Sequence, residues 1–231
     1  MTQESKPCGR MSNWLSQLFF NWLLFLMSVV LNPTVATIGC EHVIHIGDSL
    51  SLPMQTELKN SYIMLGAPNV ILSVGNGRSI RYAQAPDTVS GLDAIKYWRN
   101  KLHRSTVCWV IALGTNDSAT NRPDEWRRRI DALLEAVDGD PVVMVNVWYD
   151  SDNRPEYSEE DALEWNATLL EYVTKHSNFN VFDWATLAQS HPEWFTFDGI
   201  HYGKLGITAR VKWVSEGSMS IFAMKGMIHG D

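Results

Sequence analysis

Short apolar runs alternate with longer amphipathic stretches over most of the chain. Five runs are dominated by apolar residues, at positions 43–46, 69–74, 107–113, 142–147 and 178–182. Runs of this length and character are typical of parallel strands that are buried on both faces. The third run, VCWVIAL, is the strongest strand signal in the sequence, and we expect it to be central in the sheet.

The stretches between these runs carry apolar residues at helical spacing. Residues 50–58 and 90–102 are two such stretches, and a further helix is expected to begin at Pro123. The helix before the last strand is expected to face inward with Leu163, Trp165, Leu169 and either Tyr172 or Val173. Strands separated by helices in this way imply a parallel sheet that is covered on both faces and joined by right-handed crossovers.

The N-terminal part of the chain has a different pattern. Residues 14–31, WLSQLFFNWLLFLMSVVL, are uncharged and follow Lys6 and Arg10, which is typical of an export signal. The length of this stretch lies between a signal-peptide core and a spanning helix. We therefore expect residues 1–39 to be a signal peptide or a membrane anchor, and residues 40–231 to be an exported domain. The domain would then be secreted or held at the outer face of the cytoplasmic membrane.

The three cysteines form no CxxC pair, so they indicate neither a zinc site nor a disulfide-rich scaffold. Cys40 follows a weak match to a lipoprotein cleavage site, and it also lies just before the first predicted strand. Cys108 lies in the third predicted strand. If these strands are neighbours, an exported chain can join the two residues by a disulfide. Lipidation of Cys40 and pairing with Cys108 are both left open by the sequence.

Charge excludes some classes of function. The formal net charge is −7, which argues against nucleic-acid binding because phosphate contacts need clustered cations. The one basic cluster, at residues 127–129, falls on a predicted helix and is expected to be its solvated face. His42 and His45 lie three residues apart on a strand and point to opposite faces, so they are not a metal-binding pair.

Polar candidates for chemistry follow three of the predicted strands. Ser49, Gly77 and Asn116 come shortly after strands one, two and three. In a parallel α/β sheet, ligands bind beyond the carboxyl ends of the strands. Three separate loops are therefore expected to meet at one edge of the sheet.

The residue types fit nucleophilic catalysis. A serine hydroxyl becomes a nucleophile when a base accepts its proton, and the base needs an acid that orients it and stabilises its charged form. Ser49 is the candidate nucleophile, His201 the base and Asp198 the acid. The N–H groups of Ser49 and Gly77 and the side chain of Asn116 are candidate donors for an oxyanion hole.

Four segments occur in an order that resembles a known family, the SGNH (GDSL-type) hydrolases. They are GDSL at 47–50, Gly77, GTND at 114–117 and DGIH at 198–201. The resemblance implies a flavodoxin-like three-layer α/β/α sandwich with a five-stranded parallel sheet. It also implies ester or thioester substrates, with no metal and no organic cofactor. The segment around Arg78 resembles exported bacterial members, including some that act on acylated cell-wall sugars.

One part of the resemblance departs from the family pattern. The segment VGNGRS at 74–79 lacks the longer spacing that is common in the family, so Gly75 and Gly77 compete for the oxyanion role. We favour Gly77, because Arg78 and Ser79 stand where the family usually has a polar pair.

We expect a serine esterase that hydrolyses carboxylic esters of a small molecule, sugar or lipid. An O-acyltransferase acting on cell-envelope glycans would need the same residues and stays an alternative. A catalytically silent carbohydrate-binding protein is a third possibility, and the presence of all three triad candidates argues against it.

Overall fold

A computed structural model describes residues 39–119, 122–150, 154 and 156–228 of the chain. The predicted export segment lies outside the described residues, so the division into leader and domain at residue 39 stays a prediction. In the described part, no helix combines the length and the apolar character needed to cross a membrane.

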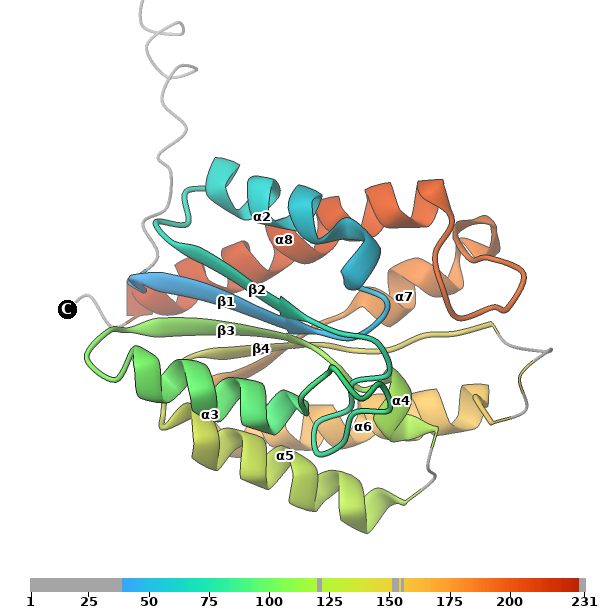
Figure 1. Ribbon diagram of the computed structural model, residues 1–231, viewed down its shortest axis with the longest axis horizontal. Helices are drawn as coiled ribbons and strands as arrows, with labels where there is room; N and C mark the ends of the chain where they lie inside the picture. The colour runs from blue at the N-terminus through green and yellow to red at the C-terminus, as the bar shows by residue number, and fades with distance from the viewer. Residues whose placement is uncertain (1–38, 120–121, 151–153, 155, 229–231) are drawn as a thin grey trace, which may run out of the picture. The chain divides into compact units, whose positions relative to one another are not determined.

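A five-stranded parallel sheet forms the centre of the domain (Figure 1). Its strand order is β2-β1-β3-β4-β5, and all neighbouring strands are parallel. The strands are β1 (His42–Gly47), β2 (Val70–Val74), β3 (Val107–Ala112), β4 (Val142–Val145) and β5 (Phe179–Phe182). The five predicted strands are thus confirmed with small shifts at their ends, and the third is central and fully buried.

Helices cover both faces of this sheet, as the sequence predicts. In Figure 1, α2, α7 and α8 lie on one face, and α3, α5 and α6 lie on the other. The helices are α2 (Gln55–Met64), α3 (Gly91–Lys101), α4 (Thr115–Ser118), α5 (Pro123–Val137), α6 (Glu159–Lys175), α7 (Trp184–Gln189) and α8 (Lys204–Ile228), with short 3-10 turns η1 (Leu52–Met54) and η2 (Pro192–Trp194). The domain is a three-layer α/β/α sandwich.

The strand register brings the candidate site loops to one edge of the sheet. Gly47, the last residue of β1, lies opposite Val74 at the end of β2 and Ala112 at the end of β3. The loops that follow these strands therefore begin side by side. We call this edge the carboxyl end of the sheet and the opposite edge its amino end.

Two helix predictions need correction, and one long helix was not predicted. The helix expected at residues 50–58 begins later, because a 3-10 turn precedes α2 and the chain turns around Asp48 first. Leu163 on α6 is 52% exposed, so the inward face of that helix is made by Trp165, Leu169 and Tyr172. The long helix α8 was not predicted, because its apolar residues lack the one-sided spacing on which helix prediction depends.

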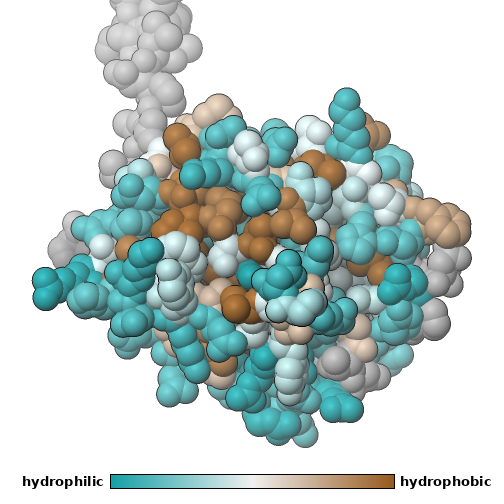
Figure 2. Space-filling view, in the orientation of Figure 1, coloured by the Kyte–Doolittle hydropathy of each residue, from teal (hydrophilic) through white to brown (hydrophobic). Residues whose placement is uncertain are grey.

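Strand β2 is an edge of the sheet, and apolar surface gathers around it. Figure 2 shows brown surface on the face of the molecule that carries this strand. Ile71 and Leu72 of β2 are partly buried, whereas nearby Ile63 and Met64 at the end of α2 are exposed. This edge strand is therefore less covered than the fully buried central strand β3.

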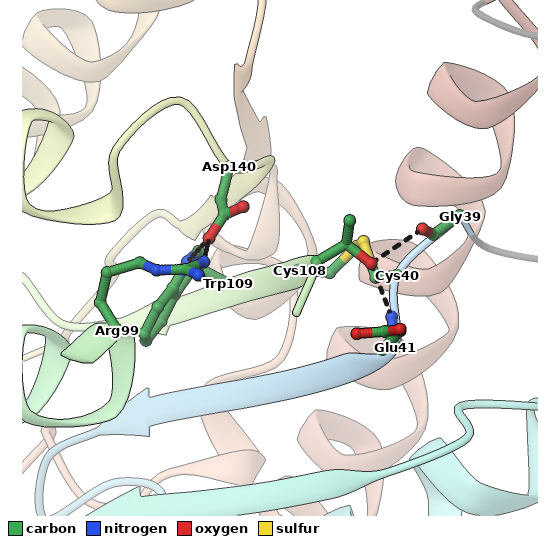
Figure 3. Close-up of a disulfide and its surroundings, with 8 residues drawn as sticks. Gly39, Cys40, Glu41, Arg99, Cys108, Trp109 and Asp140 are labelled. Atoms are coloured by element: carbon green, nitrogen blue, oxygen red, sulfur yellow. Dashed lines mark hydrogen bonds and ion pairs between the residues drawn. A yellow bond between two sulfur atoms is a disulfide. The ribbon is translucent and has the colours of Figure 1, made fainter. Parts of the chain in front are cut away.

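At the amino end of the sheet, a disulfide joins the chain before β1 to β3 (Figure 3). The Cα atoms of Cys40 and Cys108 are 5.7 Å apart, and both residues are buried. The Thr106 hydroxyl donates to the Gly39 carbonyl and accepts from the Glu41 N–H. Because the Cys40 sulfur is used in this bond, it is not available for a thioether to lipid.

A second cross-link at the amino end is electrostatic. The Asp140 carboxylate, before β4, accepts hydrogen bonds from the Arg99 guanidinium on α3 and from the Trp109 indole on β3 (Figure 3). These contacts tie a helix, a strand and a loop together at the edge opposite the candidate site.

Candidate active site

Ser49, His201 and Asp198 form one hydrogen-bonded line at the carboxyl end of the sheet. The Ser49 Oγ lies 3.0 Å from His201 Nε2, and His201 Nδ1 lies 2.7 Å from Asp198 Oδ2. Ser49 follows β1, while the other two residues lie in the loop before α8, more than 140 residues later in the chain. The fold therefore joins segments that are far apart in sequence. In this arrangement the imidazole bridges the hydroxyl and the carboxylate.

The loop that carries His201 is held by its own backbone. Thr196 N–H donates to the His201 carbonyl at 2.7 Å, and Gly199 N–H donates to the Thr196 carbonyl at 2.9 Å. Gly199 has a φ of +67°, a conformation that glycine adopts without steric cost. Asp198 Oδ1 accepts from the N–H groups of Ile200 and His201. One carboxylate oxygen is thus anchored to the turn, and the other faces the imidazole.

The Asp198 carboxylate is stabilised in its charged form. Burial by itself raises the pKa of Asp198, but hydrogen bonds from the His201 ring and from the backbone of the turn outweigh it. A further hydrogen bond comes from the Thr196 hydroxyl, at 2.8 Å. Together these donors hold the pKa of Asp198 well below its ordinary value, so the acid is charged at neutral pH.

The backbone after β1 turns around Asp48. Its Oδ1 accepts from the Leu50 N–H at 2.9 Å, and its carbonyl accepts from the N–H groups of Ser51 and Leu52. Asp48 is fully buried, and burial raises the pKa of its carboxyl to about 6, with the Leu50 hydrogen bond opposing. This turn projects Ser49 into the site, where it stays partly exposed.

Gly75 and Gly77 differ in what their amides do. The Gly75 N–H donates to the Gly47 carbonyl at 3.2 Å and so continues the pairing of β1 and β2. Gly77 lies further into the loop with a φ of +57°, and its carbonyl accepts from the Gln84 N–H. The amide of Gly75 is therefore committed to the sheet.

The side-chain amide of Asn116 is oriented from two sides. Its Nδ2 donates to the Arg78 carbonyl at 3.0 Å, and the Tyr157 hydroxyl lies 3.4 Å from its Oδ1. A primary amide carries two N–H bonds, so one remains for a ligand after the bond to Arg78. The structure thereby brings the Asn116 loop and the Gly77 loop into direct contact.

Two arginines beside the site are buried, which the sequence did not indicate. Arg78 is 4% exposed and donates to the carbonyls of Ser73 and Val89, which fixes the loop after β2. Arg129 is 2% exposed and pairs with Asp117, whereas the sequence assigned it to a solvated face. The prediction of a solvated face was wrong for Arg129, because its guanidinium pairs with the buried carboxylate of Asp117. Apolar periodicity alone carries no sign of such a pair.

The described residues contain no group of three or more His, Cys, Asp or Glu side chains placed to hold a metal ion.

His45 is buried between the Tyr62 hydroxyl at 3.1 Å and the Ser51 hydroxyl at 3.0 Å. Burial lowers the pKa of His45 to about 3, with the charge of Arg210 adding to the effect. It is a neutral structural histidine under the loop that carries Ser49.

The sandwich, its strand order and the position of the serine loop define the fold of the SGNH (GDSL-type) hydrolases, which confirms the predicted fold class. No family model matches the chain. A solved lipase/acylhydrolase from Enterococcus faecalis is 17% identical, with a TM-score of 0.63 over 78% of this chain and 96% of its own. The C-terminal catalytic domain of Streptococcus pneumoniae peptidoglycan O-acetyltransferase A is 19% identical, with a TM-score of 0.60 over 83% and 97%. Likenesses at these identities establish the fold.

A curated relative is similar in sequence as well. The chain is 27% identical over 161 residues to the "Putative peptidoglycan O-acetyltransferase YrhL" of Bacillus subtilis (strain 168). The match covers 70% of this chain and 21% of the relative, so the chain spans about a fifth of the length of that protein.

Proposed function

We propose that this chain is a serine esterase of the SGNH type that forms an acyl-enzyme on Ser49. The observation that carries the proposal is the continuous line from Ser49 Oγ through the His201 ring to Asp198, with contacts of 3.0 and 2.7 Å. This is the geometry that a nucleophile, a base and an orienting acid require.

In the first step, Ser49 Oγ attacks the ester carbonyl carbon while His201 Nε2 takes the hydroxyl proton. Asp198, charged at neutral pH, stabilises the imidazolium and keeps Nδ1 protonated. The carbonyl π electrons move to the oxygen and form a tetrahedral oxyanion. Collapse of this intermediate breaks the bond to the alcohol, which leaves with the proton from His201.

The oxyanion needs donors that are in place before the reaction begins. We assign this role to the N–H groups of Ser49 and Gly77 and to the second N–H of the Asn116 amide. Gly77 is preferred to Gly75 because the Gly75 amide already donates to Gly47. All three donors follow strands at the carboxyl end of the sheet: Ser49 and Gly77 lie in loops, whereas Asn116 lies on the short helix α4.

The acyl-enzyme is resolved by a second attack on its carbonyl carbon. When water attacks, His201 accepts its proton and then gives a proton to Ser49 Oγ as the acyl–oxygen bond breaks, which releases a carboxylic acid. When a sugar hydroxyl attacks, the same proton transfers occur and the product is a new ester. We therefore propose a small-molecule or glycan ester as substrate, with neither a metal nor an organic cofactor taking part.

Acyl transfer to a cell-envelope glycan is the second candidate function. It is supported by the likeness to proteins whose names describe peptidoglycan O-acetyl transfer. An exported location also fits the Cys40–Cys108 disulfide, since such bonds persist in oxidising compartments.

A fluorophosphonate probe tests the nucleophile. We expect it to label Ser49 in the wild-type chain, as mapped by peptide mass spectrometry, and not to label the Ser49→Ala variant. Equal labelling of the two proteins would contradict the assignment. A wild-type chain that neither reacts nor turns over short-chain nitrophenyl esters, yet binds glycans, would instead support the silent carbohydrate-binding alternative.

Product analysis separates hydrolysis from transfer. The chain is incubated with an activated acetyl ester, with and without an oligosaccharide from peptidoglycan, and the products are identified by mass spectrometry. Free acetate in both cases supports the esterase. Acetylated glycan formed at the expense of acetate, and absent with Ser49→Ala, supports the transferase.

A further inference from the structure

The carboxylate of Asp117 joins the short helix α4 to the loop after β2, the two segments to which we assign the Asn116 and Gly77 oxyanion donors. Asp117 directly follows Asn116 and is fully buried. Both of its oxygens accept from the backbone N–H of Ile80, at 3.2 and 3.1 Å. Ile80 lies three residues after Gly77, and the Asn116 side chain also donates to the Arg78 carbonyl in this segment. The two segments are thus cross-linked twice.

Arg129 completes the cross-link from helix α5. Its Nη1 donates to Asp117 Oδ1 at 2.7 Å, and its Nε and Nη2 donate to Glu125 Oε1. The guanidinium also lies 5.3 Å from the ring centre of Tyr82, in the loop that follows Gly77. Arg129 therefore contacts both the acid and the loop that the acid binds.

A gain in stability does not account well for this pair. Removing two charges from water costs several kcal/mol each, and a well-packed apolar pair of similar volume is often as stable. Burial raises the pKa of Asp117 to about 6, while the bonds from Arg129 oppose the rise. Instead of stability, the planar guanidinium gives the carboxylate that it binds one fixed orientation.

We propose that Arg129 is a positioning residue for the oxyanion hole, because it holds the Asp117 carboxylate in the orientation that sets the spacing between Gly77 and Asn116. The inference rests on the proposed function. Donors to an oxyanion must lie within a narrow range of distances, and a displacement of about 1 Å can cost about a hundredfold in rate.

The kinetic test uses the full chain with the variants Arg129→Met and Arg129→Lys. For Arg129→Met we expect kcat on an activated ester to fall about tenfold to a hundredfold, with KM changed less than about twofold. Arg129→Lys keeps the positive charge and should recover part of the loss. Arg127→Met is the matched control on the same helix, because Arg127 pairs with Glu171 at the surface.

A comparison of oxygen and thiono esters separates an oxyanion-hole effect from a general loss of structure. The hole is shaped for a carbonyl oxygen, so its distortion should lower the preference for the oxoester over the matching thionoester. A smaller folded fraction or a displaced His201 lowers both rates equally. We expect the preference to fall at least about fivefold in Arg129→Met and to stay at the wild-type value in Arg127→Met. Equal losses on both esters, or wild-type kcat in a folded Arg129→Met, would overturn the proposal.

Amide-hydrogen exchange gives a readout that does not depend on turnover. We expect faster exchange at residues 77–80 and 114–118 in Arg129→Met than in wild type or Arg127→Met. Unchanged exchange there overturns the positioning role, whatever the activity. A chain that shows this change but has no esterase or transferase activity overturns the proposed function instead. Should Arg129→Met not fold, the neutral double variant Asp117→Asn/Arg129→Met takes its place, with the same expected fall in oxoester preference.

Discussion

The two ends of the sheet are cross-linked in different ways. At the amino end, the Cys40–Cys108 disulfide and the Arg99–Asp140 ion pair join neighbouring segments of the chain. At the carboxyl end, Ser49 and His201 are hydrogen-bonded to each other and stay partly exposed. Only the carboxyl end brings a partly exposed serine, histidine and aspartate together in one hydrogen-bonded line among the described residues. Changes at the two ends should therefore separate activity from stability.

The largest expected effect is the loss of Ser49, the proposed nucleophile. We expect Ser49→Ala to lower kcat/KM on an activated ester about 10⁴-fold or more, because water must then attack without covalent catalysis. The urea midpoint should change little, since Ser49 is partly exposed. Ser105→Ala, at the amino end, is the control and should retain activity. A Ser49→Ala chain with more than a tenth of wild-type activity would remove the basis for the comparison.

The converse change removes the disulfide. We expect the double variant Cys40→Ser/Cys108→Ser to lose about 4 kcal/mol in free energy of unfolding, because the bond closes a loop with a sequence separation of 68. Its kcat should stay within about twofold of wild type below the unfolding transition. Urea unfolding with and without reductant checks this, since reductant should destabilise wild type and leave the variant unchanged. Loss of turnover in a fully folded variant would show that the two ends are coupled.

An intermediate effect is expected at the proposed oxyanion hole. Asn116→Ala removes one side-chain donor and should lower kcat about a hundredfold, with little change in KM. Asn100→Ala, an exposed asparagine on α3 near the amino end, is the control. If the two variants had the same kcat, Asn116 would be only a link to the Arg78 carbonyl and not a donor to the reaction.

The sequence predicted the strands and the candidate triad for a definite reason. Buried parallel strands are nearly continuous apolar runs, and the residue that follows each run lies at a known edge of the sheet. Ser49 and Asn116 could be placed in this way. The proximity of His201 to Ser49 was a hypothesis, based on the residue types and on the resemblance, that only three-dimensional coordinates could examine.

What the sequence did not reveal depends on long-range polar contacts. In the sequence, the run of arginines at 127–129 looks like the solvated face of a helix. Arg129 is buried because it pairs with Asp117, which lies on a different element. The choice between Gly75 and Gly77 depends on which amide pairs with Gly47. Neither contact changes the spacing of apolar residues along the sequence, so neither could be predicted from that spacing.

The smallest expected effect concerns His45, which lies on β1 between the two ends. Burial, with the charge of Arg210 adding to it, lowers the pKa of its imidazole from 6.5 to about 3. In the unfolded chain the ring takes up a proton as the pH falls through about 6.5, but in the folded chain it does so only near pH 3. The unfolded state therefore binds more protons within this window. Stability from the neutral ring is complete above pH 6.5 and is lost as the pH falls, by about 2 kcal/mol between pH 7 and 5.

The variant His45→Gln should abolish this part of the pH dependence while keeping a polar side chain between Tyr62 and Ser51. Burial raises the pKa of Asp48 and of Asp117 to about 6, so these acids titrate in the same window with the opposite sign. The useful quantity is accordingly the difference in free energy of unfolding between wild type and variant, because the acids contribute equally to both. We expect that difference to move by about 2 kcal/mol in favour of His45→Gln on going from pH 7 to 5. His103→Gln, on the surface near the amino end, is the control, and an equal shift in both variants would mean that burial of His45 is not its cause.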